Sequence, residues 1–289
     1  MENILTQKKY LGDVLESVYQ YFEAADLYYG HGTDNPWDEA CALVLGHLNL
    51  DPGAGEEVLE QPLNSKIQDE IYAIAGLRVA TRKPLSYLMH QAWFAGLKFY
   101  VDERVIIPRS PFAELIQKNF RPWLNQKPKR VLDLCTGSAC IALAVLHYGA
   151  EDLQVDAIEL SSQALEVATI NKNRLDPLNR LRLIQSDLFS ALEPQKQYDL
   201  IISNPPYVDA EDMDNLPPEY RHEPKMSLEA GNDGLEIVAK ILKEAKQFLK
   251  PGGLLFVELG NSRSALEARY PDLPFVWLEF EAGGEGVFL

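Results

Sequence analysis

Residues 130–140 read Arg-Val-Leu-Asp-Leu-Cys-Thr-Gly-Ser-Ala-Cys, an apolar run followed by a turn of small residues. The run predicts a buried strand over 130–134, and the turn predicts entry into a helix over 138–148. Such a turn lets a ligand approach the backbone at a helix N-terminus. Gly137 is the only glycine of the turn, so the three-glycine dinucleotide fingerprint is missing. One close-approach glycine beside the acidic Asp133 suits a nucleoside that carries an amino acid better than a dinucleotide.

The alternation of apolar runs with helical patterns continues through the rest of the chain. Strands are expected near 130–134, 154–159, 180–185, 198–203, 252–259, 275–280 and 284–289. Helices are expected near 138–148, 161–173 and 234–250. This alternation predicts an α/β fold with a doubly wound, mostly parallel, seven-stranded sheet. Only the short turn Ala282-Gly283-Gly284 separates the last two runs, so the final strand is expected to be antiparallel.

The first third of the chain is predicted to be helical. Leu11, Val14, Val18 and Phe22 recur at three- and four-residue steps, which is typical of an amphipathic helix. Asn35-Pro36 is a typical helix start, and Ser65 is a candidate cap for a third helix. Runs at 94–101 and 104–107, separated by Asp102-Glu103, predict a β-hairpin. We therefore expect a helical domain (1–91), a linking β-hairpin (92–110) and an α/β domain (111–289).

The composition narrows the class of protein. The 289 residues include 43 acidic and 27 basic side chains, a net charge of −16, which disfavours a grip on nucleic-acid phosphates. The charge either keeps the protein soluble or attracts a basic partner such as a ribosomal protein. Three cysteines form neither a disulfide framework nor a metal-ligand spacing, so no metal is expected. With no signal peptide and no membrane-spanning run, we expect a cytoplasmic protein with no membrane partner.

Carboxylates end the strands that follow the first one. Glu159 comes at the end of the run 155–159, about twenty residues after the turn, where an acid can accept both ribose hydroxyls. Asp187 follows the next run and is expected to receive an adenine amino group, while Leu188 or Phe189 packs on the base. Successive strand ends therefore predict one nucleoside site.

The run 198–203 is followed by Asn204-Pro205-Pro206-Tyr207. The two prolines fix two φ angles and remove two amide donors, so the loop is stiff and presents acceptors. These acceptors are the Asn204 side-chain oxygen and the Pro205 carbonyl, which together suit an –NH2 group. The Tyr207 ring is expected to stack on the plane of that group. This arrangement is suited to methylation of a planar amino or amide nitrogen.

Taken together, these residues resemble the class I S-adenosylmethionine-dependent methyltransferases. Pro108-Arg109 with the Asn-Pro-Pro-Tyr loop is similar to the protein-glutamine N5-methyltransferases. The resemblance implies S-adenosylmethionine as cofactor, with S-adenosylhomocysteine as product. It assigns the cofactor to Asp133, Cys135, Thr136, Gly137, Ser138, Glu159, Asp187, Leu188 and Asn204. Catalysis falls to Asn204, Pro205 and Tyr207, and substrate binding to Asn204, Pro205, Pro206, Tyr207 and Arg109.

Within this family, three stretches resemble the branch that modifies the third protein of the large ribosomal subunit. They are residues 29–40, Pro108-Arg109-Ser110-Pro111, and residues 220–224. The release-factor branch would carry Pro-Asp-Thr-Glu after the arginine. Two departures from the family are Ala139, where a glycine is usual, and an end at Leu289, where relatives continue for several residues. The resemblance implies a basic ribosomal protein as substrate. It also implies that residues 1–91 form the substrate-recognition domain and residues 111–289 the S-adenosylmethionine-dependent methyltransferase domain.

Three other functions are compatible with the residues. Release-factor methylation would use the same loop and cofactor site. Nucleic-acid amino methyltransferases use similar loops, because the same two acceptors would hold the exocyclic amine of a flipped base. A cofactor-binding assembly factor without catalysis would keep the nucleoside site and have no use for the loop. Within the family branch, Arg109 either positions the substrate backbone or braces the loop, and His31 and His222 either contact substrate or make structural hydrogen bonds.

Overall fold

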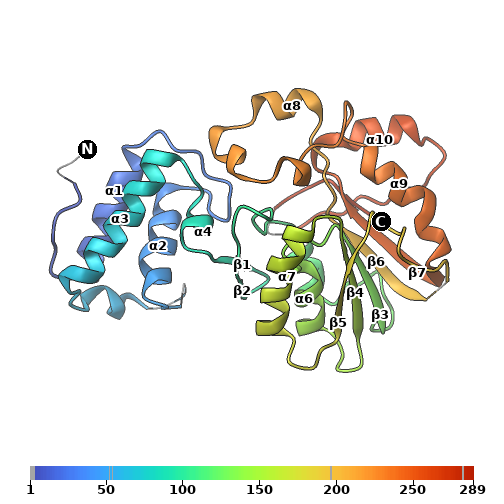
Figure 1. Cartoon of the computed structure of the whole chain (residues 1–289), viewed down its shortest axis with the longest axis horizontal. Coiled ribbons are helices and arrows are strands. Elements are labelled where there is room, and N and C mark those ends of the chain that lie inside the picture. Colours follow the sequence, from blue (N-terminus) through green and yellow to red (C-terminus); the bar gives the residue numbers. More distant parts are fainter. Residues whose placement is uncertain (1–3, 52, 54, 196, 282) are drawn as a thin grey trace. The chain divides into compact units, whose positions relative to one another are not determined.

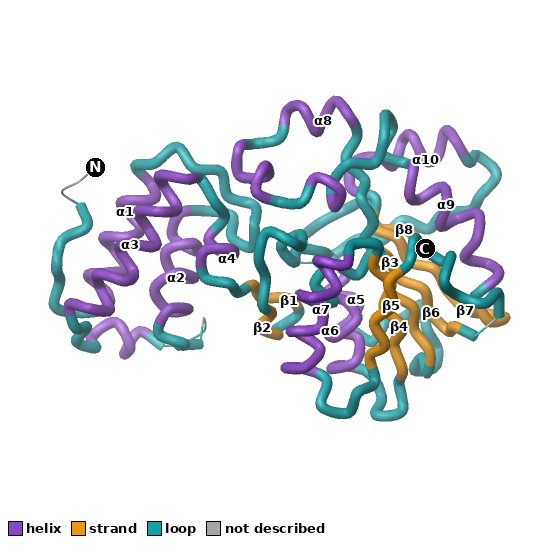
Figure 2. The backbone as a smooth tube through the Cα atoms, in the orientation of Figure 1, coloured by secondary structure: helices purple, strands orange, loops and turns teal. Residues whose placement is uncertain are grey.

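The computed structural model describes residues 4–51, 53, 55–195, 197–281 and 283–289 (Figure 1). The chain divides into two compact units. The helical unit runs to Gln91 and also includes Pro217–His222, and the sheet unit comprises Ala92–Leu216 and Glu223–Leu289. Figure 2 shows helices dominating the first unit and a strand-rich core in the second. The predicted helical segment is present as a unit with its own hydrophobic core. The functional roles predicted for the three segments stay predictions.

The helical unit contains four helices within its described residues. They are α1 (Leu11–Glu23), α2 (Pro36–His47), α3 (Ser65–Thr81) and the short α4 (Leu85–Leu88), with 3-10 turns η1 (Glu56–Glu60) and η2 (Pro218–His222). The predicted stripe of α1 is fully buried in the core of the unit. Asn35 caps α2 by accepting from the Asp38 amide, as its Asn-Pro start predicts. The cap of α3 is Asn64 rather than Ser65, because its side chain accepts from the Ile67 amide.

Buried charges hold the distant segment Pro217–His222 in the helical unit. Glu219 is completely buried, and its Oε1 accepts from the Tyr28 amide at 2.9 Å and pairs with Arg82 at 2.8 Å. Arg78, also buried, pairs through Nε with Glu39 at 2.6 Å. Buried charges are tolerated only when they are paired, so each arginine fixes a carboxylate in place. A segment some 190 residues downstream of Tyr28 is thereby part of the same core.

The main sheet of the sheet unit has six strands in the described part of the chain. They are β3 (Arg130–Leu134), β4 (Gln154–Glu159), β5 (Leu181–Gln185), β6 (Tyr198–Ser203), β7 (Leu249–Glu258) and β8 (Val287–Phe288). Their order is β5-β4-β3-β6-β7-β8, with β3 to β7 parallel and β8 antiparallel to β7. The doubly wound, mostly parallel fold with an antiparallel last strand is therefore confirmed.

The seventh expected strand, near 275–280, is reduced to a short pairing. Trp277 forms an isolated antiparallel bridge with Phe288, flanked by backbone hydrogen bonds between Val276 and Leu289 and between Leu278 and Val287. The segment therefore lies outside β8 at the edge of the sheet. It is too short to count as a strand because its partner β8 spans only two residues. Ala282, part of the expected turn between the two segments, lies outside the described residues.

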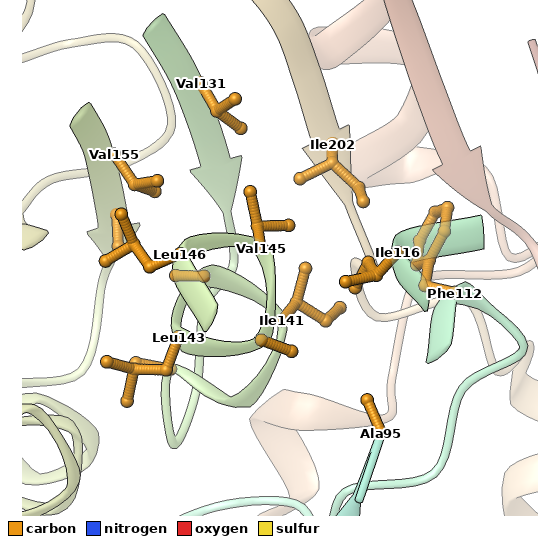
Figure 3. Close-up of a cluster of buried hydrophobic side chains, with 14 of the residues drawn as sticks. Ala95, Phe112, Ile116, Val131, Ile141, Leu143, Val145, Leu146, Val155 and Ile202 are labelled. Atoms are coloured by element: carbon orange, nitrogen blue, oxygen red, sulfur yellow. The ribbon is translucent and has the colours of Figure 1, made fainter. Parts of the chain in front are cut away.

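Helices cover both faces of the sheet, as two separate apolar clusters show. On one face, Val131, Val155 and Ile202 meet α6 (Cys140–Tyr148), together with α5 (Phe112–Gln117) and α7 (Ser162–Leu175) (Figure 3). On the other, Leu132 and Ile201 meet α9 (Glu236–Glu244) and α10 (Arg263–Arg269). Neighbouring strand residues point to opposite faces, so a strand buried on both reads as a continuous apolar run. The remaining elements are α8 (Ala210–Asn215), η3 (Lys225–Ser227), η4 (Ala245–Gln247) and η5 (Gly260–Ser262).

Among the differences from the sequence-based expectation are the end of one helix and the position of the hairpin turn. The helix expected over 234–250 ends as α9 at Glu244 with the turn η4, since β7 already begins at Leu249. The prediction of a hairpin over 94–107 was wrong about where its strands and turn lie. It consists of β1 (Ala92–Phe94) and β2 (Leu97–Phe99), and the chain reverses at Ala95-Gly96.

The hairpin turns at Ala95-Gly96 because both residues have positive φ, 49° and 78°, as tight hairpin turns require. Asp102 does not form the hairpin turn and instead pairs with Arg104. Its carboxylate accepts from the backbone amide and the guanidinium of Arg104, and this pairing lowers the pKa of Asp102 to about 2. The segment 104–107 therefore leaves the hairpin as an irregular chain.

Ala139 occupies a conformation that favours glycine. It precedes α6 with φ 63° and ψ 24°, and its methyl group is fully buried. An L-residue in this left-handed region costs about 1–2 kcal/mol. We expect Ala139→Gly to raise the free energy of unfolding by about 0.5–1 kcal/mol, after the extra entropy of glycine in the unfolded chain. Urea unfolding checks this, with Ala142→Gly inside α6 as the control that should destabilise. A loss of stability in both variants would contradict the strain.

Candidate active site

The ends of four parallel strands meet at one edge of the sheet. From β3 the chain steps outward to β4 and β5, then returns to β6 on the opposite side of β3. The strand order therefore reverses between β3 and β6, and open α/β sheets bind ligands at this switch point, outside the carboxyl ends of the strands. The turn after β3 and the loop after β6 flank this point, since Leu134 is in register with Ser203.

The turn after β3 leaves its backbone open at Gly137. This residue has φ 54°, and a Cβ atom there would meet only the Ile106 Cγ2 atom, at 3.9 Å. The Gly137 amide donates to Glu159 Oε2 at 2.9 Å, and the Thr136 amide donates to the Ile158 carbonyl at 2.9 Å. The turn is thus tied to the end of β4 and still has room for a ligand against its glycine.

Asp133 supports this turn from inside the protein. Its side chain has no exposed surface, and Oδ2 accepts the Thr136 hydroxyl at 2.5 Å. Burial raises the pKa of Asp133 to about 7. The carbonyl of Ser138 accepts from the Asn171 side chain at 3.0 Å, which holds the far end of the turn. In this structure Asp133 braces the turn, and a direct contact with cofactor stays a prediction, as it does for Cys135, Thr136 and Ser138.

Two carboxylates follow β4 and β5 as predicted. Glu159 is partly buried, and its two oxygens accept the amides of Gly137 and Ser161, each at 2.9 Å. A carboxylate has about four lone-pair sites, so Glu159 keeps capacity for two ligand hydroxyls. Asp187 is exposed, and beside it Leu188 is buried with φ 46°. Phe189, also buried, stacks on Phe248 with ring centroids 4.5 Å apart. A contact of Leu188 or Phe189 with the base stays a prediction.

The Asn204-Pro205-Pro206-Tyr207 loop leaves the end of β6 next to the turn. Ser203 Oγ donates to the Leu134 carbonyl at 3.0 Å, which joins the two strand ends. After the loop, Val208 pairs with the segment around Glu229 through two backbone hydrogen bonds, at 2.8 and 2.9 Å. The loop is therefore held at both ends, as its two prolines predict.

Tyr207 is anchored at its ring and at its hydroxyl. The hydroxyl donates to Glu258 Oε1 at 3.1 Å, and the ring lies against Gly260, where a Cβ atom would come within 2.6 Å of the ring. Gly260 has φ 53°, so both its conformation and the close approach favour glycine. The stacking of Tyr207 on a substrate amide stays a prediction, but the structure shows what positions the ring.

We expect Gly260→Ala to displace the Tyr207 ring, because ring atoms within 3 Å of a new methyl group have to move. The expected result is about a tenfold lower kcat for the loop's reaction, with cofactor affinity within threefold of the unchanged chain, since a misplaced contact near the chemistry costs rate. Gly252→Ala is the control, since that glycine also has positive φ and open space around it. Equal losses in both variants would point to backbone strain instead of the ring.

Glu258, at the carboxyl end of β7, is a site residue that the sequence analysis did not select. It is buried and accepts the Ser110 hydroxyl at Oε2 at 2.5 Å, and the nearby Asn204 side chain favours its charged form. Burial raises the pKa of Glu258 to about 7. The available signal was its position, because it ends an apolar run as Glu159 does. That signal places a residue at the sheet edge without indicating its partners.

Arg109 forms a bidentate ion pair with Glu223. Both guanidinium contacts measure 2.6 Å, and Glu223 also accepts the Ile107 amide at 3.0 Å. Glu223 is buried, so the pair locks the segment before α5 to the segment after His222. These contacts support the bracing alternative for Arg109, and a contact with substrate stays a prediction.

The two histidines singled out in the sequence make contacts inside the helical unit. His222 donates to the Thr81 carbonyl at 3.1 Å, and the ring centroids of His31 and Tyr220 lie 4.5 Å apart.

No group of three or more His, Cys, Asp or Glu side chains in the described part of the chain is arranged to hold a metal ion. Burial raises the pKa of both Cys135 and Cys140, which favours protonated thiols. No described helix is long and apolar enough to cross a membrane.

Comparison with known proteins identifies the family. Residues 114–217 match the methyltransferase small domain family. A ribosomal protein uL3 glutamine methyltransferase of Neisseria meningitidis is 47% identical over 96% of this chain and 91% of that protein. One of Francisella tularensis is 46% identical over 92% and 85%. The chain belongs to this family of glutamine methyltransferases. The hMettl16 catalytic domain, solved with a MAT2A 3′UTR hairpin, shares the fold at 16% identity, with a TM-score of 0.50 over 79% and 82% of the two chains.

Membership in this family makes the chain an S-adenosylmethionine-dependent methyltransferase, as the resemblance implied. The site fits this cofactor in chemistry. Glu159 has acceptor capacity for ribose hydroxyls, exposed Asp187 can accept an adenine amino group, and the open backbone at Gly137 admits an amino-acid moiety. A single glycine in the turn also agrees with a ligand that carries no diphosphate. The assignment of each residue to a part of the cofactor stays our prediction.

Proposed function

We propose that this enzyme methylates the side-chain amide nitrogen, N5, of a glutamine in ribosomal protein uL3 of the large subunit. The observation that carries the proposal is the similarity of nearly the whole chain to relatives named for that activity. The Asn204-Pro205-Pro206-Tyr207 loop supports it from the structure. The loop lies at the switch point of the sheet and offers an amide acceptor where cofactor and substrate would meet.

S-adenosylmethionine supplies a methyl group on a sulfonium, which is electrophilic and leaves behind a neutral thioether. The glutamine amide nitrogen is a poor nucleophile, because its lone pair is delocalised into the carbonyl. Asn204 Oδ1 and the Pro205 carbonyl would accept its two N–H bonds and hold it in line with the methyl carbon. Positive charge would grow on the nitrogen as it takes up the methyl group, and the Asn204 and Pro205 oxygens would stabilise that charge.

The proton balance requires no strong base before attack. The alkylated nitrogen becomes acidic and releases one of its N–H protons to solvent, which leaves a neutral N-methyl amide. Acceptors in the loop are therefore the chemistry that this reaction needs. The proline positions contribute by removing backbone donors that would otherwise compete for the Asn204 and Pro205 oxygens.

The charge of the chain suits the proposed substrate. A net charge of −16 attracts a basic ribosomal protein over long range. It opposes the phosphate backbone of RNA, which argues against base methylation. Ribosomal proteins are made in the cytoplasm, so we place the reaction there. We propose that the helical unit recognises the substrate, because no step of the chemistry uses its residues.

The proposal is tested by radiolabelled methyl transfer to purified uL3, a peptide-chain release factor and ribosomal RNA. Label on uL3 alone, at a glutamine and removed by protease digestion, is the expected result. Label on the release factor would reassign the substrate within the same chemistry. Nuclease-sensitive label on RNA would overturn the protein substrate while leaving the fold and the methyl donor in place.

A further inference from the structure

Glu258 lies against the catalytic loop and has no part in the chemistry derived above. Two hydroxyls donate to its carboxylate: Ser110, before α5, to Oε2 at 2.5 Å, and Tyr207, in the loop after β6, to Oε1 at 3.1 Å. The Asn204 side chain, from the same loop, is near enough to favour the charged form of Glu258. Glu258 is only 4% exposed, so water competes little for these contacts. A buried carboxylate with these partners restricts the orientation of each donor.

We propose that ionised Glu258 is a positioning residue, which binds the NH2 group of Asn204 and thereby directs Asn204 Oδ1 toward the substrate amide. The inference rests on the proposed function for the identity of that amide. The hydrogen-bonding capacities of the two side chains determine which end of the amide faces Glu258. An ionised carboxylate only accepts hydrogen bonds, and in a side-chain amide only the nitrogen donates. A bond between Glu258 and Asn204 therefore uses Nδ2 and leaves Oδ1 as the free acceptor.

The orientation of Asn204 needs support, because the two ends of its side-chain amide have nearly the same shape and packing alone distinguishes them poorly. A flipped Asn204 side chain would present its own NH2 group to the NH2 group of the glutamine. The glutamine nitrogen would then lose Asn204 Oδ1 as a hydrogen-bond acceptor. Glu258 selects the productive orientation by accepting only from nitrogen.

The surroundings of Glu258 fix the direction of its pH dependence. The groups that face it are the Ser110, Asn204 and Tyr207 donors and the Arg109 charge, whose guanidinium is paired with Glu223. These groups favour the carboxylate, burial opposes it, and burial prevails, so the pKa of Glu258 rises to about 7. Protonated Glu258 gains an O–H donor that can bind Asn204 Oδ1. Methyl transfer is therefore expected to fall as the pH drops below about 7.

Kinetics of Glu258→Gln test the role. We expect kcat for uL3 methylation to fall about 30-fold, with the S-adenosylmethionine Kd within threefold, and the loss of activity below pH 7 to disappear. In an Asn204→Ala background the same change should cost less than threefold, because its target is already missing. Asp176→Asn is the matched control, since Asp176 is a buried carboxylate that accepts the Leu181 amide far along the chain from the loop. Unchanged kcat in Glu258→Gln overturns the proposal.

A second readout is independent of the substrate. The Asn204 side-chain NH2 resonance, assigned by its loss in Asn204→Ala, is followed by NMR against pH in the full chain. We expect it to move with a midpoint near pH 7 and to stop titrating in Glu258→Gln. A resonance that ignores both pH and the substitution overturns the inference even if uL3 is methylated. If the resonance titrates but uL3 is not methylated, the proposed substrate fails and the pairing stands.

Discussion

Asn204→Ala is expected to lower kcat for methylation of uL3 by about 100- to 1,000-fold, the loss seen when one preorganised charge-stabilising group is removed. The alanine removes Oδ1, which would hold one N–H of the glutamine amide while positive charge grows on its nitrogen. The Pro205 carbonyl would remain, so the residual reaction would proceed with one acceptor. Single-turnover transfer of radiolabelled methyl to uL3 measures the effect.

The structure supplies a matched control for this substitution. Asn215 ends α8 on the surface, where its side chain donates to the Glu211 carbonyl at 2.8 Å. Asn215→Ala should retain kcat within twofold. In Asn204→Ala the S-adenosylmethionine Kd should rise by less than tenfold, since Asn204 is predicted to contact the cofactor as well. An unchanged kcat would refute the acceptor role of the loop, whereas an equal loss in both variants would indicate general misfolding.

Glu159→Ala is expected to weaken S-adenosylmethionine binding by about 100-fold. The substitution removes the predicted acceptor of two ribose hydroxyls, and each hydrogen bond to a charged group contributes about 1.5–3 kcal/mol. It also removes the partner of the Gly137 amide and so loosens the turn against which the cofactor lies. Isothermal titration calorimetry of the purified chain measures the Kd directly.

The control for this change is another glutamate of the sheet unit. Glu151 is exposed in the turn after α6, so Glu151→Ala should leave the Kd within twofold. Glu159→Gln separates the two effects of Glu159, because the amide keeps one acceptor oxygen and should lose about tenfold in affinity. If Glu159→Ala binds the cofactor as tightly as the unchanged chain, the nucleoside lies elsewhere on the sheet edge.

Much of the fold was predictable because parallel strands buried on both faces leave a strong pattern. The runs that became β3, β4 and β6 are continuous in apolar residues, and their bounds agree with the expectation. Local turn chemistry was weaker evidence. At the hairpin, Asp102-Glu103 resembled a turn, but the chain reverses at Ala95-Gly96. The sequence did not indicate this turn, because alanine rarely adopts a positive φ.

The sequence by itself determined the fold class, the family, and the order of acidic residues and the Asn-Pro-Pro-Tyr loop along the strand ends. It did so because strand periodicity and strand–turn–helix motifs are local properties. Tertiary structure alone decided which buried groups meet: Glu258 with Asn204 and Tyr207, Arg109 with Glu223, and Glu219 with the helical unit. Each of these pairings joins residues far apart in the chain, and what selects it is the cost of burying an unpaired charge in one particular three-dimensional core.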